Sequence, residues 1–333
     1  MERASSIGPP SRVGTEVVRP PMHIFFATDG SASARFAQAQ ILAIPWRSPI
    51  QLTVMTAVHI PAPPFTSFVS SAQQAFDAAS ATLRREAEVR AEEVLAKARY
   101  ALEASAASVA MRMHAGPPGA KIVEMARACR VDLIAVGSRG LGPYKGYLLG
   151  SVSDHVANNA RCSVLLAKTP PKRTGRYLLA LDDSRYAVAV LRWLRELDLS
   201  KGAWIHLVKV FRSMEEFPDP DGRDWVCACD RTAPAMFAPW GDAPEVLKEL
   251  CEEGLDRTIA RVTVEVRFGH EAPEILASVR KFDPDILVMG AKGHYTTAAS
   301  PLGNVARKVI DHAPCSVLIV RPSGQGFPDP ISH

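Results

Sequence analysis

The chain has 333 residues, of which 47% are hydrophobic and 22% charged, with a formal net charge of +4. This length suits two domains of about 150 residues. The mild charge gives no reason to expect nucleic acid or an anionic membrane as the main partner. No apolar run approaches the ~20 residues of a membrane span, and residues 1–20 lack the apolar core of a secretory signal. We therefore expect a cytoplasmic protein whose six cysteines stay reduced.

Alternating apolar and helical patterns run through the chain. In the first part, strands are predicted over His23–Thr28, Leu52–Val58, Val109–His114, Asp132–Val136 and Ser163–Ala167. Helices are predicted over Ala32–Ile44, Ser71–Ala107, Ala120–Ala128 and Ser151–Asn159. In the second part, strands are predicted over Tyr177–Leu181, Trp204–Val210, Val262–Arg267, Ile286–Met289 and Val317–Val320. Continuous apolar strands that alternate with helices indicate a parallel sheet covered on both faces.

The second part repeats the first at a constant spacing. Asp29 and Asp182 are 153 positions apart. The same separation relates further pairs of glycines and cysteines, namely Gly116/Gly269, Gly137/Gly290, Gly140/Gly293, Gly150/Gly303 and Cys162/Cys315. One offset that holds over a whole domain indicates a tandem duplication. The predicted fold is α/β, with two tandem doubly wound, Rossmann-like domains that each have a five-stranded parallel sheet and helices on both faces.

The expected boundaries follow from the repeat. The first domain covers 21–168 and the second covers 176–323, joined by a linker over 169–175. A disordered tail is expected over 1–20 and a short tail over 324–333. The copies differ most at 213–241, a Pro-rich insertion that reads as a long loop. It contains Cys227 and Cys229, but there is no second cysteine pair at zinc spacing, so we expect no metal site.

A glycine loop follows the fourth strand of the first copy. Gly137 and Gly140 bracket a turn, nine residues follow, and Gly150 with Ser151 opens a helix. Glycines let a backbone approach an anion, and the amides of a helix N-terminus point at it. Ser151 and Ser153 offer hydroxyls, and two cations lie in the same loop, Arg139 and Lys145.

Asp29 lies at the end of the first strand, where an open parallel sheet binds its ligands. Its carboxylate can accept hydrogen bonds from ribose hydroxyls. The plainer interpretation is that the glycines only make a tight strand-to-helix connection. The complete pattern, with Asp29 and the loop together, favours a nucleotide.

The spacing of the three glycines, together with Asp29, resembles the ATP-binding pattern of the universal stress protein family. Two copies of the pattern cover most of the chain, which therefore resembles a tandem member. The resemblance implies ATP, with Mg²⁺, in the first domain. Asp29 would contact the ribose and Val58 the adenine. The phosphates would be wrapped by Gly137, Arg139, Gly140, Gly150, Ser151, Val152 and Ser153. The resemblance also implies a nucleotide-dependent stress or signalling module that is often dimeric.

The second copy keeps the spacing and changes the chemistry, so we expect a weak or vacant site there. The positions that correspond to the first site are Asp182, Gly290, Lys292, Gly293, Gly303 and Asn304. Ser153 is replaced by Ala306, and Val58 by Phe211, which would crowd an adenine. Each lost hydroxyl contact is worth about 0.5–1.5 kcal/mol.

Two other functions stay open. The first is a slow ATPase or phosphotransferase in which Ser151 or Ser153 accepts phosphate, although no general base is paired with either by spacing, so dedicated catalysis is not expected. The second is a nucleotide-free scaffold for a protein partner. In a tandem chain the halves can also form the family's dimer internally, around a pseudo-two-fold axis, through the last strands 163–167 and 317–320. A further homodimer stays open.

Overall fold

The computed structural model describes residues 21–59, 70–140, 149–172, 175–182, 184–198, 202–213, 226–228, 261–293 and 301–322. The expected tails, Lys145 and most of the Pro-rich insertion lie outside these residues. Within them, no helix is both long enough and apolar enough to cross a bilayer.

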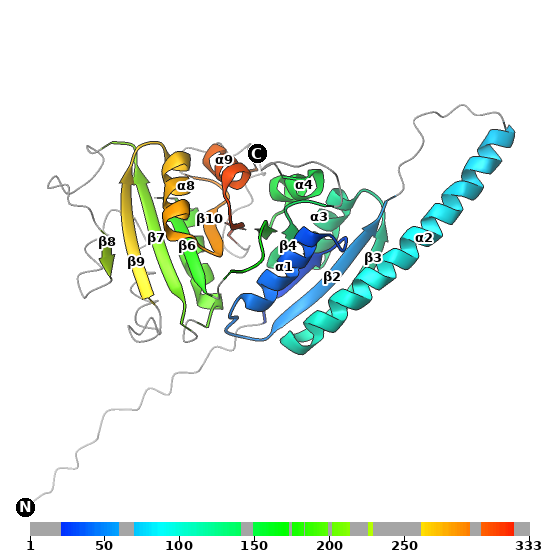
Figure 1. The fold of residues 1–333 in the computed structure, drawn as a ribbon, viewed down its shortest axis with the longest axis horizontal. Coiled ribbons are helices and arrows are strands. Elements are labelled where there is room, and N and C mark those ends of the chain that lie inside the picture. The colour runs from blue at the N-terminus through cyan, green and yellow to red at the C-terminus, as the bar shows by residue number, and fades with distance from the viewer. Residues whose placement is uncertain are drawn as a thin grey trace, which may run out of the picture.

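The first half is a five-stranded parallel sheet in the order β3-β2-β1-β4-β5. Its strands are β1 (His23–Ala27), β2 (Ile50–Val58), β3 (Ala106–Ala115), β4 (Leu133–Gly137) and β5 (Ser163–Ala167). Helices α1 (Ala32–Ala43) and α2 (Ser70–Leu102) pack on one face, while α3 (Pro118–Ala128) and α4 (Ser151–Asn159) pack together on the other (Figure 1). The predicted doubly wound fold is confirmed.

The second half repeats this order as β9-β7-β6-β10-β11. Its strands are β6 (Arg176–Leu181), β7 (Trp204–Phe211), β9 (Arg261–Phe268), β10 (Ile286–Gly290) and β11 (Ser316–Val320). Its described helices are α5 (Arg185–Trp193), α8 (Glu271–Phe282) and α9 (Asn304–His312), with a 3-10 turn over Leu194–Glu196.

Two sequence predictions need correction. The first is the Pro-rich insertion 213–241, which was expected to be a loop throughout. It contains a short strand, β8 (Val226–Ala228), which pairs antiparallel with the outer edge of β9. The second is the helix over Ser71–Ala107, because α2 ends at Leu102 and β3 begins at Ala106 after a 3-10 turn. The residues from 104 to 108 are all alanine or serine, and their pattern does not separate helix from strand.

The two sheets join edge to edge into one sheet of 11 strands. Strand β5 pairs antiparallel with β11, so the strands expected at the contact between the halves do meet there. Leu165 faces Leu318 at the centre of this pairing. Because the sheet is continuous, each of its two faces carries one hydrophobic core that contains buried residues from both halves.

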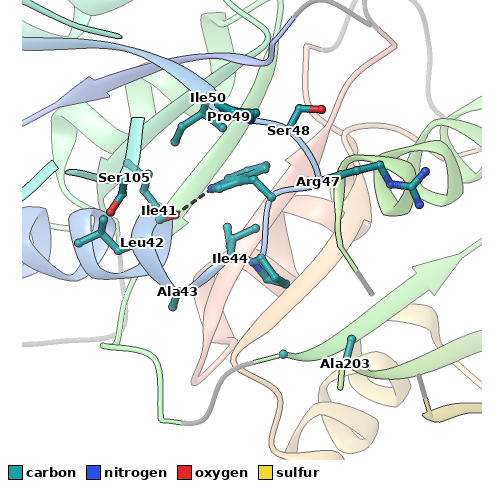
Figure 2. A pocket seen from close by; sticks show the side chains of 13 residues that line it. Ile41, Leu42, Ala43, Ile44, Arg47, Ser48, Pro49, Ile50, Ser105 and Ala203 are labelled. Atoms are coloured by element: carbon teal, nitrogen blue, oxygen red, sulfur yellow. Dashed lines mark hydrogen bonds between the residues drawn. The ribbon is translucent and has the colours of Figure 1, made fainter. Parts of the chain in front are cut away.

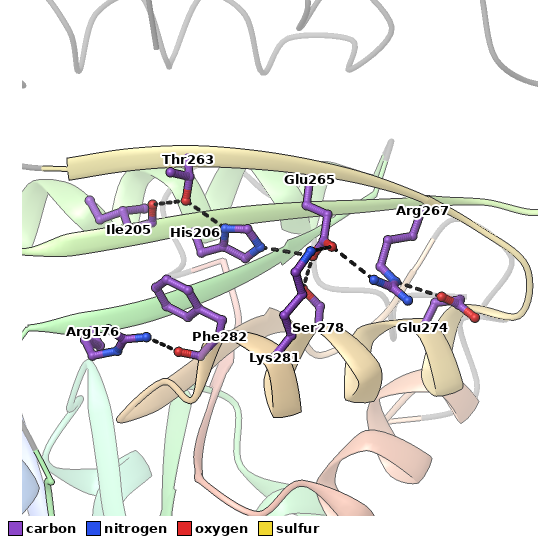
Figure 3. A network of polar contacts seen from close by, with 10 residues as sticks. All are labelled: Arg176, Ile205, His206, Thr263, Glu265, Arg267, Glu274, Ser278, Lys281 and Phe282. Atoms are coloured by element: carbon purple, nitrogen blue, oxygen red, sulfur yellow. Dashed lines mark hydrogen bonds and ion pairs between the residues drawn. The ribbon is translucent and has the colours of Figure 1, made fainter. Parts of the chain in front are cut away.

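A buried polar network lies under α8 in the second half (Figure 3). The carboxylate of Glu265 on β9 lies 3.1 Å from Nε2 of His206 on β7, and both side chains are less than a tenth exposed. Ser278 of α8 donates its hydroxyl to the same carboxylate, and Lys281 approaches it at 3.0 Å. These donors hold the pKa of Glu265 well below its usual range, His206 foremost.

Candidate functional site

Asp29 and the glycine loop meet at the carboxyl ends of β1 and β4. These neighbouring strands are where the chain switches from one side of the sheet to the other, the place where such folds bind ligands. Oδ1 of Asp29 accepts a hydrogen bond from the amide of Ser31 at 2.9 Å. A Cβ on Gly140 would lie 3.0 Å from Oδ2 of Asp29. The carboxylate and the loop backbone are therefore in direct proximity.

Gly137 lets the start of α1 approach the end of β4. A Cβ at this position would lie 2.5 Å from the carbonyl carbon and hydroxyl of Ser33. The hydroxyl of Ser33 donates to the carbonyl oxygen of Arg139, and the amide of Arg139 lies 3.3 Å from the same hydroxyl. Ser33 thus anchors the first turn of the loop. The side chain of Arg139 itself is exposed.

Gly150 opens α4 at the far end of the loop. Its amide donates to the carbonyl of Ser138 at 2.8 Å, which closes the loop on itself. No side chain in the described part of the chain caps this helix. The amides of its first turn, at Ser151, Val152 and Ser153, therefore point out of the helix end toward the side on which an anion would bind. Ser151 is exposed, whereas Val152 is half-buried.

The side chain of Ser153 is directed back at the chain. Its side chain is 2% exposed, and its hydroxyl lies 2.7 Å from the carbonyl of Ser138 and 2.9 Å from that of Gly150. A hydroxyl has one hydrogen to donate, and here the loop's own carbonyls take it. The side chain of Ser153 therefore ties the start of α4 to Ser138 and Gly150. Of the two serines, Ser151 is the exposed one.

Val58 ends β2 and is buried, at 7% exposure. Its carbonyl accepts a hydrogen bond from the amide of Gly116 at 2.9 Å, which fixes the end of the strand. It lies on the strand next to β1, on the same sheet edge as Asp29. The expected site residues in the described chain thus share one edge of the sheet.

The second half reproduces the backbone of this site. Oδ1 of Asp182 accepts from the amide of Ser184 at 3.1 Å, and a Cβ on Gly293 would lie 2.8 Å from Oδ2 of Asp182. The amide of Gly303, at the start of α9, donates to the carbonyl of Ala291 at 2.8 Å. The repeat therefore preserves these contacts at the described ends of the loop, and Asn304 and Ala306 replace the two serines at the helix start.

The side chains around the second loop are larger. Phe211 stacks on Phe268 with ring centroids 6.1 Å apart, where the first half has Val58 beside Ala115. Tyr186 takes the place of Ser33, and a Cβ on Gly290 would lie 2.6 Å from the Cβ of Tyr186. Sequence reasoning identified Phe211 and missed both Phe268 and Tyr186. The 153-residue offset, applied to every residue near the loop, would have found them.

Lys292 stands where Arg139 stands in the first half. Burial lowers its pKa, and the nearby positive charges of Arg185 and Arg321 lower it further. Lys292 therefore lies close to two further positive charges in the second half.

An open cavity of about 500 Å³ lies elsewhere, at the opposite edge of the sheet (Figure 2). It is bordered by the end of α1, the start of β2 and Ala203, which precedes β7. Trp46 in its wall donates its indole N–H to the carbonyl of Ile41 at 2.9 Å. None of the residues expected to bind nucleotide lines this cavity.

Within the described residues, no three His, Cys, Asp or Glu side chains gather as a metal site would require. The cysteines described with side chains, Cys129, Cys162 and Cys315, are free thiols, and burial raises the pKa of Cys162 to about 11.

The family model described as "Universal stress protein family" matches twice, over residues 21–168 and 174–321. The chain belongs to the universal stress protein family. The two matches fall one on each half of the sheet, so this member of the family carries two copies of the family's domain.

Sequence similarity to individual universal stress proteins supports this assignment. A universal stress protein from Methanocaldococcus jannaschii is 37% identical over 81 residues, which make up 24% of this chain and 48% of that protein. The match thus spans about half the length of that relative. A Staphylococcus epidermidis protein named after the same family is 28% identical over 149 residues, which make up 44% of this chain and 84% of that protein.

Solved structures of the family share the fold. A universal stress protein from Archaeoglobus fulgidus superimposes with a TM-score of 0.58 at 20% identity, covering 90% of this chain and 96% of that one. A Pseudomonas aeruginosa protein superimposes with a TM-score of 0.53 at 16% identity, covering 91% of this chain and 94% of that one. Both comparisons cover the two halves together.

Proposed function

We propose that the first half binds ATP and that the protein acts in the cytoplasm as a nucleotide-dependent stress-response or signalling module. The observation that carries the proposal is the proximity of the Asp29 carboxylate, the Gly140 backbone and the uncapped first turn of α4. A carboxylate suits ribose hydroxyls, and a helix N-terminus beside small residues suits phosphates.

The residues present fit the nucleotide. Gly140 has no side chain to fill the space beside Asp29. Ser151 is exposed at the helix start, where its hydroxyl and amide can both donate to a phosphate oxygen. Arg139 is exposed on the same loop and supplies a positive charge. Mg²⁺ would accompany the triphosphate, with phosphate and water oxygens as its ligands.

The second half is proposed to bind ATP weakly or not at all. The described ends of its loop keep the backbone hydrogen bond of Gly303 and the contact between Asp182 and Ser184, while several side chains differ. Phe211 and Phe268 lie at the sheet edge of the second half that corresponds to the expected adenine position in the first. Asn304 also replaces the exposed Ser151.

Titration calorimetry with Mg-ATP tests the stoichiometry. We expect one site per chain, with a Kd in the micromolar range or tighter. Two sites of equal affinity would contradict the assignment of the second half, and no binding would contradict the proposal itself.

Matched variants locate the site. Gly140→Val places a branched side chain against the Asp29 carboxylate, and we expect it to abolish the ATP-induced rise in Tm. Gly293→Val makes the same change against Asp182 and should leave that rise intact. If Gly293→Val alone removes it, the working site is in the second half. If neither variant changes it, the nucleotide does not bind to these loops.

A further inference from the structure

The contact between the halves consists of mirrored pairs. Leu165 of β5 faces its own equivalent, Leu318 of β11. On either side of this pair, Val164 faces Ile319 and Leu166 faces Val317. A residue that faces its own equivalent lies beside the pseudo-two-fold axis. At the centre of this interface, the two halves therefore contribute equivalent positions with similar apolar side chains.

The polar contacts around the strands are mirrored as well. The amide of Lys168 donates to the hydroxyl of Ser316 at 3.3 Å, and the amide of Arg321 donates to the hydroxyl of Ser163 at 3.2 Å. Lys168 is equivalent to Arg321 and Ser163 to Ser316, so each contact is the counterpart of the other. They would form equally well if a first half met the first half of another molecule.

One pair breaks this symmetry. Asp154 and Arg307 occupy the same position in the first turns of α4 and α9, and they form an ion pair with each other across the interface. Their side chains are about 36% and 41% exposed, respectively. Like Leu165 and Leu318, they are equivalents that face each other, but they carry opposite charges.

The helix ends do not explain both charges. An acidic side chain in the first turn suits the positive end of the dipole of α4, but a basic one in the first turn of α9 opposes it. Arg307 also lies 3.5 Å from Asp311, one turn further along the same helix. The contact with Asp154 accounts for a basic residue at a position that its own helix disfavours.

We propose that Asp154 and Arg307 select the pairing of unlike halves, so that the interface of the first half accepts the second half and rejects a second copy of itself. In a pairing of two first halves every mirrored contact would persist, but Asp154 would face Asp154. In a pairing of two second halves, Arg307 would face Arg307. Repulsion between like charges near the axis disfavours both alternatives. Specificity is the difference in binding free energy between these pairings and the native one.

The test separates the halves after folding. A site for a specific protease is inserted in the linker between positions 173 and 174, and the purified chain is cut and incubated at low concentration. Native mass spectrometry then distinguishes unlike pairs from pairs of two first halves or two second halves. We expect only unlike pairs from the wild-type chain. Cut chains that form like pairs would overturn the proposal.

Neutral and swapped variants isolate the charges. Asp154→Asn combined with Arg307→Gln should allow like pairs to form, rising at least about tenfold above the wild type. Asp154→Arg combined with Arg307→Asp should again give only unlike pairs. Arg99→Gln combined with Glu103→Gln removes an ion pair within the first half and serves as the control that should form no like pairs. Exclusive unlike pairing in the neutral variant would overturn the proposal.

A second measurement uses the uncut chain, in case the cut halves separate completely. Asp154→Arg and Arg307→Asp alone should each lower the Tm by about 2–4 °C. The swapped double variant should recover most of that loss. A double variant whose Tm falls by the sum of the two single losses would show that the charges do not act on each other, and would overturn the proposal.

Discussion

Lys168 and Arg321 stand at equivalent positions, and each binds the carboxyl end of the other half's last helix. Nζ of Lys168 donates to the carbonyl of Ala313 at 2.8 Å and also to that of Ile310. Nη2 of Arg321 donates to the carbonyl of Ala157 at 2.6 Å. Cations are favoured at helix C-termini, where carbonyls lack partners within the helix. The two contacts thus join the halves on the α4–α9 face of the sheet.

The burial of Lys168 makes a prediction about pH. Burial lowers its pKa to about 8, from an ordinary value of 10.5. Between these values the unfolded chain binds more protons than the folded one, so this residue makes stability rise with pH across that window. We expect the wild type to gain stability relative to Lys168→Met as the pH goes from 7.5 to 10.5, measured by urea unfolding. Groups that titrate in both proteins cancel in the difference. A difference that stays flat or falls would contradict the assignment.

The fold was predictable from sequence because its signals are local or repeated. Apolar runs marked the strands, and the single offset of 153 residues placed the second half. The edge-to-edge contact followed from the same pattern, because the last strand of each half is short and apolar and would otherwise expose an unpaired edge. The strand β8 gave no comparable signal, since three residues are too few to show a period.

The details of the site were less predictable, because they depend on contacts between distant residues. The hydroxyl of Ser33 meets the carbonyl of Arg139, 106 positions away. Ser153 was expected to contact a phosphate from the start of the helix, and its hydroxyl donates to carbonyls that sequence alone does not place. The glycines were predicted to let the backbone approach an anion. Among the described residues, Gly137, Gly140 and Gly150 are not in the left-handed region, so it is the lack of a side chain that matters there.

The buried network of the second half predicts acid sensitivity. The pKa of Glu265 is lowered by the donors around it, so its stabilising effect is complete above the unfolded value of about 4.3 and is lost as the pH falls below that. Glu265→Gln should reduce the free energy of unfolding at pH 7 by about 1–3 kcal/mol. The gap between variant and wild type should shrink as the pH falls from 5 to 3.

Glu86→Gln provides the control for this measurement. It removes an exposed carboxylate that lies 3.9 Å from Arg90, and pairs of this kind contribute about 0–1 kcal/mol. Its unfolding curves should follow those of the wild type at every pH. A Glu265→Gln protein that behaved in the same way would contradict the role given to the network.

The close approach at Gly137 predicts a loss of stability that does not depend on nucleotide. In Gly137→Ala the new Cβ would meet the backbone of Ser33 and Ala34 at 2.5–2.6 Å, and backbone cannot rotate away as a side chain can. We expect about 1–3 kcal/mol of destabilisation in urea. Gly140→Ala, whose Cβ would meet only a side-chain oxygen at 3.0 Å, should lose less. Equal losses in the two variants would mean that α1 shifts freely, which would contradict tight packing against β4.

The two serines at the start of α4 should respond in opposite ways, a prediction that rests on the proposed ATP site. Ser153→Ala removes a hydroxyl whose hydrogen the loop carbonyls accept, so it should lower stability by about 1 kcal/mol and leave the Kd for Mg-ATP within about threefold. Ser151→Ala removes an exposed hydroxyl next to the proposed phosphate position, so it should keep stability and weaken binding about tenfold. Urea unfolding and calorimetry on the same two proteins separate the effects.

If Ser153→Ala instead caused the larger loss of affinity, its hydroxyl would have to leave the carbonyls of Ser138 and Gly150 when the nucleotide binds, and the loop would be remodelled by its ligand. If Ser151→Ala bound as tightly as the wild type, the phosphates would rest on backbone amides alone, and Asn304 would no longer explain a weak second site.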